Sequence, residues 1–263
     1  MPEPLNPAVP RLPTRREQRR SVRPKRGILR VTARAIGELL LTCGVVLLLF
    51  VGWELWWTNV LADSKQSEAV KSFALEFSGP LPPATHADYG PPVVTPAPMY
   101  GKTIGIIYIP RFGATYTRPI IEGTGSDVLD TLGLGHYPNT TMPGTPGNFA
   151  VAGHRQTHGA VLDNIHTLVP GDKIYVQTAD GYYTYVFRNN QIVLPNRSDV
   201  LFPVPTRPGV QPRESILTMT SCNPRFGSQE RIIAYSLLDS WQPVSAGPPP
   251  EIAPQVAKAQ GKE

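Results

Sequence analysis

The sequence predicts a mainly β domain, a closed or nearly closed barrel with short helices, preceded by a single N-terminal transmembrane helix. Between about Tyr100 and Trp241, short runs rich in β-branched and aromatic residues follow one another at close spacing, with few long helical patterns between them. Ahead of this region, residues 35–57 form an apolar segment long enough to cross a bilayer, for which ~20 residues suffice. These two observations define the fold class and divide the chain.

Residues 1–34 form a basic tail, with ten Lys or Arg against two Glu. This tail carries a charge of +8 and the remainder −3, so the overall net charge of +5 does not describe the folded region. A nucleic-acid-binding protein would carry its basic residues on that folded region, so we expect no nucleic-acid partner. Basic residues beside a transmembrane helix stay in the cytoplasm. The tail is therefore predicted to be cytoplasmic, and everything after residue 57 extracellular.

The apolar segment 35–57 favours a retained, single-pass membrane anchor over a cleaved signal peptide. Glu38 and Glu54 lie near its ends, where water or lipid headgroups solvate them. Its far end carries three tryptophans, Trp53, Trp56 and Trp57. Tryptophan is typical of the membrane interface, whereas a signal peptide would place small residues there.

Residues 58–99 are predicted to be a juxtamembrane helix followed by a spacer. Apolar residues recur at near-helical spacing over residues 59–77. Residues 79–98 contain seven prolines and indicate an extended, semi-rigid spacer that holds the domain away from the membrane. At the other end, residues 242–263 are rich in Pro, Ala, Gln and Lys, which predicts a disordered tail.

The domain between these segments, residues 100–241, contains eight strand-like runs and two short helical stretches. The runs are Ile104–Ile109, Thr115–Ile121, Phe149–Ala152, Lys173–Gln177, Tyr182–Arg188, Ile192–Leu194, Ile216–Thr220 and Arg231–Leu237. Asp180 and Gly181 indicate a hairpin turn. The helical stretches are Ser126–Leu132, with Ser126 as N-cap, and His158–Ile165.

Cys222 is the candidate nucleophile. Cys43 lies inside the predicted anchor, so Cys222 is the one cysteine of the exterior region and has no partner there. Structural cysteines in oxidising compartments usually pair, which favours a working thiol. Because a free thiol titrates near ~8.5, Cys222 needs a nearby cation to ionise. The alternative is a buried structural thiol.

His154 is the candidate proton donor, since acyl transfer needs an acid for the leaving amine. It follows the apolar run "NFAVAG" and should emerge at a strand end, with Gly153 allowing close backbone approach. The alternative is a histidine on a surface loop. The other histidines lie in the spacer or in loop-like and helical surroundings: His86, His136, His158 and His166.

Arg231 is the candidate for stabilising the oxyanion. It opens the last strong strand, and the short connection "NPRFGSQE" makes that strand a neighbour of the one ending at Cys222. Arginine stays protonated and offers five donors. The alternative is a salt bridge to Glu230 or another surface carboxylate, and Arg155 and Arg225 are weaker rivals. No His, Cys or Asp cluster shows metal-ligand spacing, so the sequence predicts no metal and no cofactor.

The anchor, spacer, β domain and two motifs together resemble the sortases, membrane-anchored cysteine transpeptidases of Gram-positive bacteria. The family signature Thr-Leu-x-Thr-Cys with a downstream arginine stands here as Thr218–Cys222 followed by Arg231. Met219 replaces the leucine, and Ser221 replaces the threonine before the cysteine. The combination of "HYPNTTMPGTPGNFAVAGHR" with "SCNPRF" is most similar to class E, the housekeeping sortases of actinobacteria.

The resemblance implies an eight-stranded sortase barrel and acyl transfer in two steps. Cys222 would attack the Thr–Gly bond of a C-terminal sorting signal similar to Leu-Ala-x-Thr-Gly on a secreted protein. His154 would protonate the leaving amine, and Arg231 would stabilise the oxyanion or orient the substrate. An amine on a peptidoglycan precursor would then resolve the thioester.

The resemblance also suggests substrate contacts at Tyr137, Thr220 and Ser221. Calcium, which regulates some sortases, is not expected because no comparable acidic cluster is present. Two other enzyme readings remain open: a cysteine hydrolase that passes its acyl group to water, and an L,D-transpeptidase. The latter places glycine before its cysteine, whereas Cys222 follows serine. An anchored β-domain scaffold is the non-enzymatic alternative.

Overall fold

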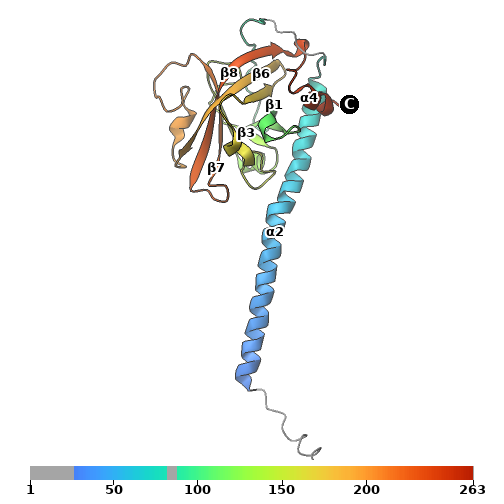
Figure 1. The fold of residues 1–263 in the computed structure, drawn as a ribbon, viewed down its shortest axis with the longest axis vertical. Helices are drawn as coiled ribbons and strands as arrows, with labels where there is room; N and C mark the ends of the chain where they lie inside the picture. Colours follow the sequence, from blue (N-terminus) through green and yellow to red (C-terminus); the bar gives the residue numbers. More distant parts are fainter. Residues whose placement is uncertain (1–26, 82–87, 263) are drawn as a thin grey trace, which may run out of the picture. The chain divides into compact units, whose positions relative to one another are not determined.

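A computed structural model describes residues 27–81 and 88–262 (Figure 1). Most of the predicted basic tail, residues 1–26, lies outside the described residues. The chain divides into two compact units, one ending at Val51 and the other beginning at Gly52.

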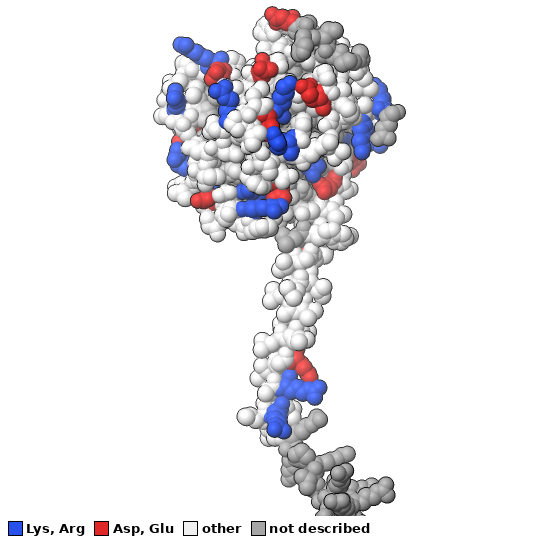
Figure 2. Space-filling view, viewed as in Figure 1, with Lys and Arg blue, Asp and Glu red and all other residues white. Residues whose placement is uncertain are grey.

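One helix, α2 (Ile28–Glu76), runs through both the predicted anchor and the predicted juxtamembrane helix. Of the described residues, it is the one helix long and apolar enough to cross a membrane. Arg34 and Glu38 form an ion pair of 2.7 Å near its N-terminal end. Figure 2 shows a long stretch of the helix without charged side chains beyond this pair. The helix thus has the length and composition that a membrane anchor requires.

The second unit contains a closed eight-stranded barrel in the order β1-β2-β3-β4-β7-β8-β6-β5, which confirms the predicted fold class. Its strands are β1 (Thr103–Tyr108), β2 (Thr117–Glu122), β3 (Leu134–His136), β4 (Gly147–Ala152), β5 (Lys173–Gln177), β6 (Gly181–Val193), β7 (Ser215–Asn223) and β8 (Glu230–Pro243). The pairs β2–β3 and β4–β7 are parallel and the others antiparallel.

Short helices connect the strands and follow the barrel. They are η1 (Pro110–Phe112), α3 (Ser126–Leu129), η2 (Asp163–Thr167), η3 (Ser198–Leu201), η4 (Val244–Ala246) and α4 (Ala253–Ala259). Gly125, rather than the predicted Ser126, is the N-cap of α3. The second predicted helical stretch, His158–Ile165, is mostly irregular because η2 begins only at Asp163.

The interior of the barrel is filled by apolar side chains. The residues that alternate with them along each strand face outward. Phe149 and Val151 of β4, with Leu217 and Met219 of β7, belong to the buried core cluster. Successive side chains of a strand point to opposite faces. Thr218, Thr220 and Cys222 therefore lie on the outer face of β7.

The C-terminal half of α2 packs against the barrel together with α4 (Figure 1). Phe73 of α2 joins a buried cluster with Tyr108 and Tyr175 of the barrel and with Ile252 and Val256 beside and within α4. The predicted disordered tail is therefore wrong over the described residues up to 262. Residues 252 and 256 lie four apart, so both face the same side of a helix and bury it despite the polar composition.

The described end of the predicted spacer, residues 88–98, lies along the barrel. The Trp241 indole N–H donates to the Gly90 carbonyl at 2.7 Å. The Thr95 hydroxyl donates to the Asp180 carboxylate at 2.9 Å. These bonds tie the proline-rich segment to β8 and the β5–β6 turn, so this part of it does not stand off from the domain as predicted.

Candidate active site

The parallel strands β4 and β7 end side by side, with Ala152 paired to Thr220. The alignment continues beyond the ladder, because the Gly153 N–H donates to the Thr220 carbonyl at 3.1 Å. Two residues past the last pair, each segment carries a side chain predicted for catalysis: His154 on one and Cys222 on the other. The parallel register therefore brings the predicted acid level with the predicted nucleophile.

The glycine before the histidine is required by packing. A Cβ at Gly153 would lie 2.6 Å from Val161 and 2.8 Å from Leu134, closer than real Cβ contacts. Any side chain here would push the end of β4 away from its neighbours. The backbone at Gly153 therefore approaches its neighbours Val161 and Leu134 closely, as the sequence indicated.

Arg231 lies directly opposite Cys222 in the antiparallel β7–β8 pair. Opposite residues point to the same face, with Cβ atoms ~5 Å apart. The Arg231 guanidinium donates to the carbonyls of Ser228 at 2.9 Å and Glu230 at 2.8 Å. These bonds hold the Arg231 side chain on the β7–β8 turn beside the cysteine. Its bonds go to backbone carbonyls, and the Glu230 carboxylate accepts a hydrogen bond from Asn223 instead.

Arg155 is a second cation at the cysteine, and sequence reasoning ranked it too low. Its side chain is buried, and Nη1 donates to the Cys222 carbonyl at 3.1 Å and to Asn223 Oδ1 at 2.7 Å. Burial lowers the pKa of its guanidinium, and the nearby Asp163 carboxylate opposes that shift. The other rival, Arg225, forms a two-bond ion pair with Asp163 instead.

His154 is paired with a carboxylate that the sequence did not single out. Its Nε2 lies 2.7 Å from Oδ1 of Asp130, which caps the C-terminus of α3. The His158 ring lies beside it, with ring centroids 5.0 Å apart, and His158 Nε2 is 4.0 Å from the same carboxylate oxygen. The two histidines lie four positions apart in the sequence, and this spacing could have indicated that their side chains meet. No local pattern in the sequence points to Asp130.

The predicted substrate contacts fall on two different faces of β7. The Tyr137 hydroxyl lies 3.0 Å from the Thr220 hydroxyl, on the outer face that also carries Cys222. Ser221 points to the opposite face, is buried, and donates to the Gly153 carbonyl at 2.8 Å. Ser221 therefore ties the histidine-bearing segment to the cysteine-bearing strand.

Helix α2 contacts the loop that follows His154. Asn59 Oδ1 accepts the Gly159 N–H at 2.8 Å, and Gln66 Nε2 donates to the His158 carbonyl at 3.2 Å. His158 has a φ of 52°, a left-handed conformation that is uncommon for a residue with a side chain. Such conformations persist where surrounding contacts fix them. The contacts from α2 supply this constraint.

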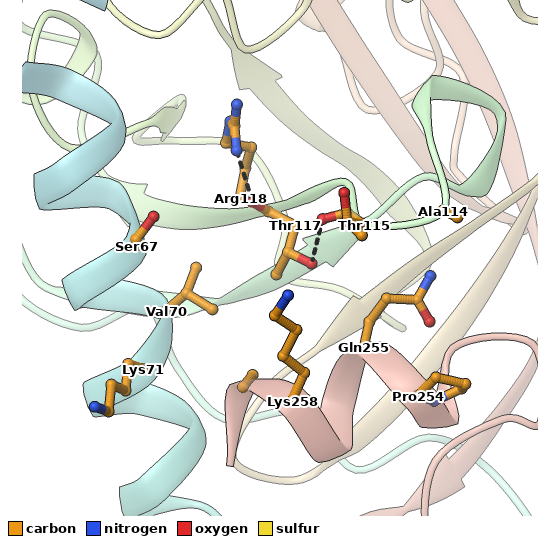
Figure 3. A pocket seen from close by; sticks show the side chains of 11 residues that line it. Ser67, Val70, Lys71, Ala114, Thr115, Thr117, Arg118, Pro254, Gln255 and Lys258 are labelled. Atoms are coloured by element: carbon orange, nitrogen blue, oxygen red, sulfur yellow. Dashed lines mark hydrogen bonds between the residues drawn. The ribbon is translucent and has the colours of Figure 1, made fainter. Parts of the chain in front are cut away.

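A separate cavity of about 360 Å³ lies between α2, β2 and α4 (Figure 3). In Figure 3, Lys258 points from α4 toward Thr117, and Val70 faces the cavity from α2. Among the described residues that line it, none is Cys222, His154 or Arg231. This cavity is therefore distinct from the candidate active site.

Comparison with known proteins agrees with this geometry. Residues 107–239 match the sortase domain family. Sortase SrtE1 of Streptomyces coelicolor is 35% identical over 250 residues, which cover 92% of this chain and 67% of that protein. The chain belongs to the sortase family.

Solved structures support placement of this sortase in class E. Sortase E from Streptomyces avermitilis is 41% identical, with a TM-score of 0.53 over 59% of this chain and 99% of that one. Sortase E1 from Streptomyces coelicolor, solved with a tripeptide in the active site, is 35% identical, with a TM-score of 0.53 over 58% of this chain and 97% of that one. Sortases are cysteine transpeptidases that act on sorting signals, so this chain is an enzyme of that class.

Proposed function

We propose that this sortase cleaves a C-terminal signal of the Leu-Ala-x-Thr-Gly type between Thr and Gly and transfers the protein to an amine of a peptidoglycan precursor. The observation that carries the proposal is the shared end of β4 and β7, where the register brings His154 level with Cys222. Arg231 stands opposite the cysteine on β8. These are the three residue types that cysteine acyl transfer needs.

In the first step, the Cys222 thiolate attacks the threonine carbonyl carbon, and the oxygen becomes an oxyanion. Arg155 and Arg231 both favour the thiolate, because each places a positive charge near Cys222. The C–N bond then breaks as His154, in its imidazolium form, gives a proton to the leaving glycine amine. The product is a thioester between the substrate threonine and Cys222.

In the second step, the acceptor amine attacks the thioester carbonyl. The neutral His154 takes a proton from the amine, and Cys222 leaves as the thiolate. The carboxylate of Asp130 accepts a hydrogen bond from His154 and orients the ring for both proton transfers. One histidine thus acts first as acid and then as base, and the enzyme returns to its starting state.

Arg231 stabilises the oxyanion in both tetrahedral intermediates. Its present bonds go to two backbone carbonyls of the turn, which lie at the edge of the cysteine face. A guanidinium has further donors that can bind the oxyanion while these bonds remain. Tyr137 and Thr220, on the same face as Cys222, contact the substrate backbone.

The enzyme is anchored with its N-terminus in the cytoplasm and its barrel outside the cell. The apolar part of α2 supports this, since it is long enough to span a bilayer. Arg30 and Arg34, at its N-terminal end, are on the side that the positive-inside rule assigns to the cytoplasm.

The test is transfer by the purified full chain in detergent micelles, given a Leu-Ala-x-Thr-Gly peptide and an amine-bearing peptide. We expect an amide adduct whose yield rises with amine concentration, and no product with Cys222→Ala. Cys43→Ala is the matched control and should keep full activity. A free acid as the sole product at every amine concentration would instead identify a hydrolase, and an unconsumed peptide a scaffold.

A further inference from the structure

We propose that Asp130, His154 and His158 form a reversible binding site for a transition-metal cation of the Zn²⁺ class, which inhibits the enzyme by occupying His154. The two histidine nitrogens and the carboxylate oxygen all lie within 4.8 Å of one another. The three residues come from the C-cap of α3, the segment just after β4 and the loop before η2, so the fold brings them together across 28 positions of the sequence.

The donor set selects the chemical class of the ion. Two imidazole nitrogens with one carboxylate oxygen suit Zn²⁺, Co²⁺, Ni²⁺ and Cu²⁺. Ca²⁺ and Mg²⁺ prefer an all-oxygen shell and are not expected to bind. A tetrahedral ion with ligands at ~2.1 Å separates its ligand atoms by ~3.4 Å. The two observed separations from the Asp130 oxygen, 2.7 Å to His154 and 4.0 Å to His158, lie on either side of that value.

The surroundings hold the backbones of two of the ligands, Asp130 and His158, in place. The backbone N–H of Asp130 is bonded to the Ser126 carbonyl at 2.9 Å. The left-handed backbone of His158 is fixed from α2 by Gln66, whose side chain would clash with any Cβ at Gly159. Little rearrangement is therefore needed on binding, and this limits the entropic cost.

The site is open to solvent. The side chains of Asp130, His154 and His158 are 37%, 29% and 26% exposed, so a hydrated ion can reach all three. A water molecule can complete a fourth position, as in open zinc sites. The His154 nitrogen that faces Asp130 is Nε2, so in the proposed mechanism the proton is exchanged at Nδ1. A metal on Nε2 takes the place of the Nε2 proton, so the ring cannot form the imidazolium that serves as the acid, and occupancy blocks transfer. This last consequence rests on the proposed function, whereas binding of the metal does not.

Binding is tested first with the full chain in detergent micelles carrying Cys222→Ala, which removes the thiol as a competing ligand. Titration with Co²⁺, followed by visible absorption, should show one ion per chain with the intense bands of a four-coordinate site. His158→Gln and Asp130→Asn should each weaken binding at least 10-fold. His166→Gln, an exposed histidine outside the group, should bind as the parent does.

Two results would overturn the site. One is the absence of Co²⁺ binding at concentrations up to about 1 mM in the Cys222→Ala chain. The other is unchanged affinity in both His158→Gln and Asp130→Asn, with circular dichroism showing that at least one of them is folded. Two ligand variants are used so that a folding defect in one leaves the test intact.

Inhibition is tested separately with the enzyme that retains Cys222. Zn²⁺ should abolish transpeptidation and a chelator should restore it, and His158→Gln should need at least 10-fold more Zn²⁺, relative to its own metal-free rate. Equal sensitivity of both proteins would mean that the metal acts at the thiol instead, which contradicts the inhibitory role. Co²⁺ binding without any transpeptidation would refute the proposed function but leave the metal site standing.

Discussion

At the scale of single residues, two arginines flank Cys222 and differ in what they bind. Arg155 is buried and bonded to the Cys222 carbonyl and the Asn223 side chain, so it supports the end of β7. Arg231 is less buried and bonded to carbonyls of the turn, so it can turn toward a new oxyanion. From this difference we propose that Arg155 acts mainly in structure and Arg231 mainly in catalysis.

The two arginines should therefore respond differently to truncation. Arg155→Ala is expected to lower the free energy of unfolding by about 1–3 kcal/mol, because it removes charged hydrogen bonds in a buried place. Arg231→Ala should lower kcat/KM by about 100-fold or more, the usual effect of losing an oxyanion donor, with a smaller loss of stability. Urea unfolding and peptide-transfer rates measure the two effects. Equal losses of stability in both variants would contradict this division.

Asp130 should act through His154 as a positioning residue. Asp130→Asn keeps the size of the side chain but removes the charge that orients and supports the imidazolium. We expect kcat to fall at least 10-fold, within the range of acid–base contributions, with little change in KM. Asp127→Asn, on the same short helix, is the control and should retain kcat. A parallel rise in KM would point to a substrate-binding role instead.

At the residue scale, the sequence singled out three residues that the registers of β4, β7 and β8 bring together, but it missed the side chains that contact them. Cys222, His154 and Arg231 stand in local motifs whose chemistry can be read along the chain. Asp130 reaches His154 from 24 positions away, and Arg155 shows its role only through a bond across to β7. Such long-range contacts depend on the register of β4 against β7, which no local pattern specifies.

At the scale of elements, α2 contributes to the active site as well as to the predicted anchor. Its buried face packs on the barrel through Val70, Phe73 and Ala74. One to three turns earlier, Asn59 and Gln66 bond the loop that follows His154. The helix therefore supports the loop from which the His158 ring contacts the ring of His154, the proposed acid.

Removing these two polar contacts should lower the rate of transfer without unfolding the barrel. In the double variant Asn59→Ala and Gln66→Ala, the loop after His154 loses its bonds to α2 and the histidine is positioned less well. Because a small misplacement of a catalytic group lowers the rate strongly, we expect about a 10-fold loss in kcat. Lys65→Ala, on the exposed side of the same helix, serves as control. A double variant as active as that control would show that the loop holds its own conformation.

Helix α4 should stabilise the second unit. Val256 is fully buried between α2 and the barrel. Val256→Asp is expected to lower the free energy of unfolding by about 2 kcal/mol or more, because it buries an unpaired charge. Lys258→Asp changes an exposed position of the same helix and should have a much smaller effect. Thermal unfolding compares the two, and equal melting temperatures would mean that α4 does not pack as described.

A comparison of the predicted runs with the observed strands shows which strand boundaries can be predicted from sequence patterns alone. The run Lys173–Gln177 coincides with β5, because its three central residues are β-branched or aromatic and polar residues bound it on both sides. β3 was missed because it has only three residues. Two predicted runs are one strand, β6, whose polar residues Asn189 and Asn190 follow a register irregularity. Short strands and bulges are set by neighbouring strands rather than by their own composition.

At the scale of the whole molecule, charge is separated along the sequence. The basic residues of the first 34 positions contrast with a remainder that carries a net charge of −3. Figure 2 shows acidic and basic side chains interspersed over the visible face of the second unit, without a large patch of either sign. The basic excess of the chain therefore lies in its N-terminal segment and not on this face of the second unit.

The proposed orientation gives a direct expectation in cells. Protease added to intact cells should degrade the barrel, whereas a tag placed at the N-terminus should remain protected until the membrane is permeabilised. The physical reason is the excess of basic residues before α2, which remain on the cytoplasmic side. Immunoblots against the tag and the barrel distinguish the two ends. A protected barrel with an accessible tag would reverse the orientation.

The most direct test of the account is capture of the acyl-enzyme. The full chain is mixed with a Leu-Ala-x-Thr-Gly peptide without an acceptor amine, quenched in acid and digested for mass spectrometry. We expect the fragment containing Cys222 to carry the substrate up to its threonine as a thioester, and the adduct to disappear when an amine is added before quenching. Turnover of the peptide without an adduct on Cys222, even at the earliest times, or with the adduct on another residue, would contradict the assignment of Cys222 as the nucleophile.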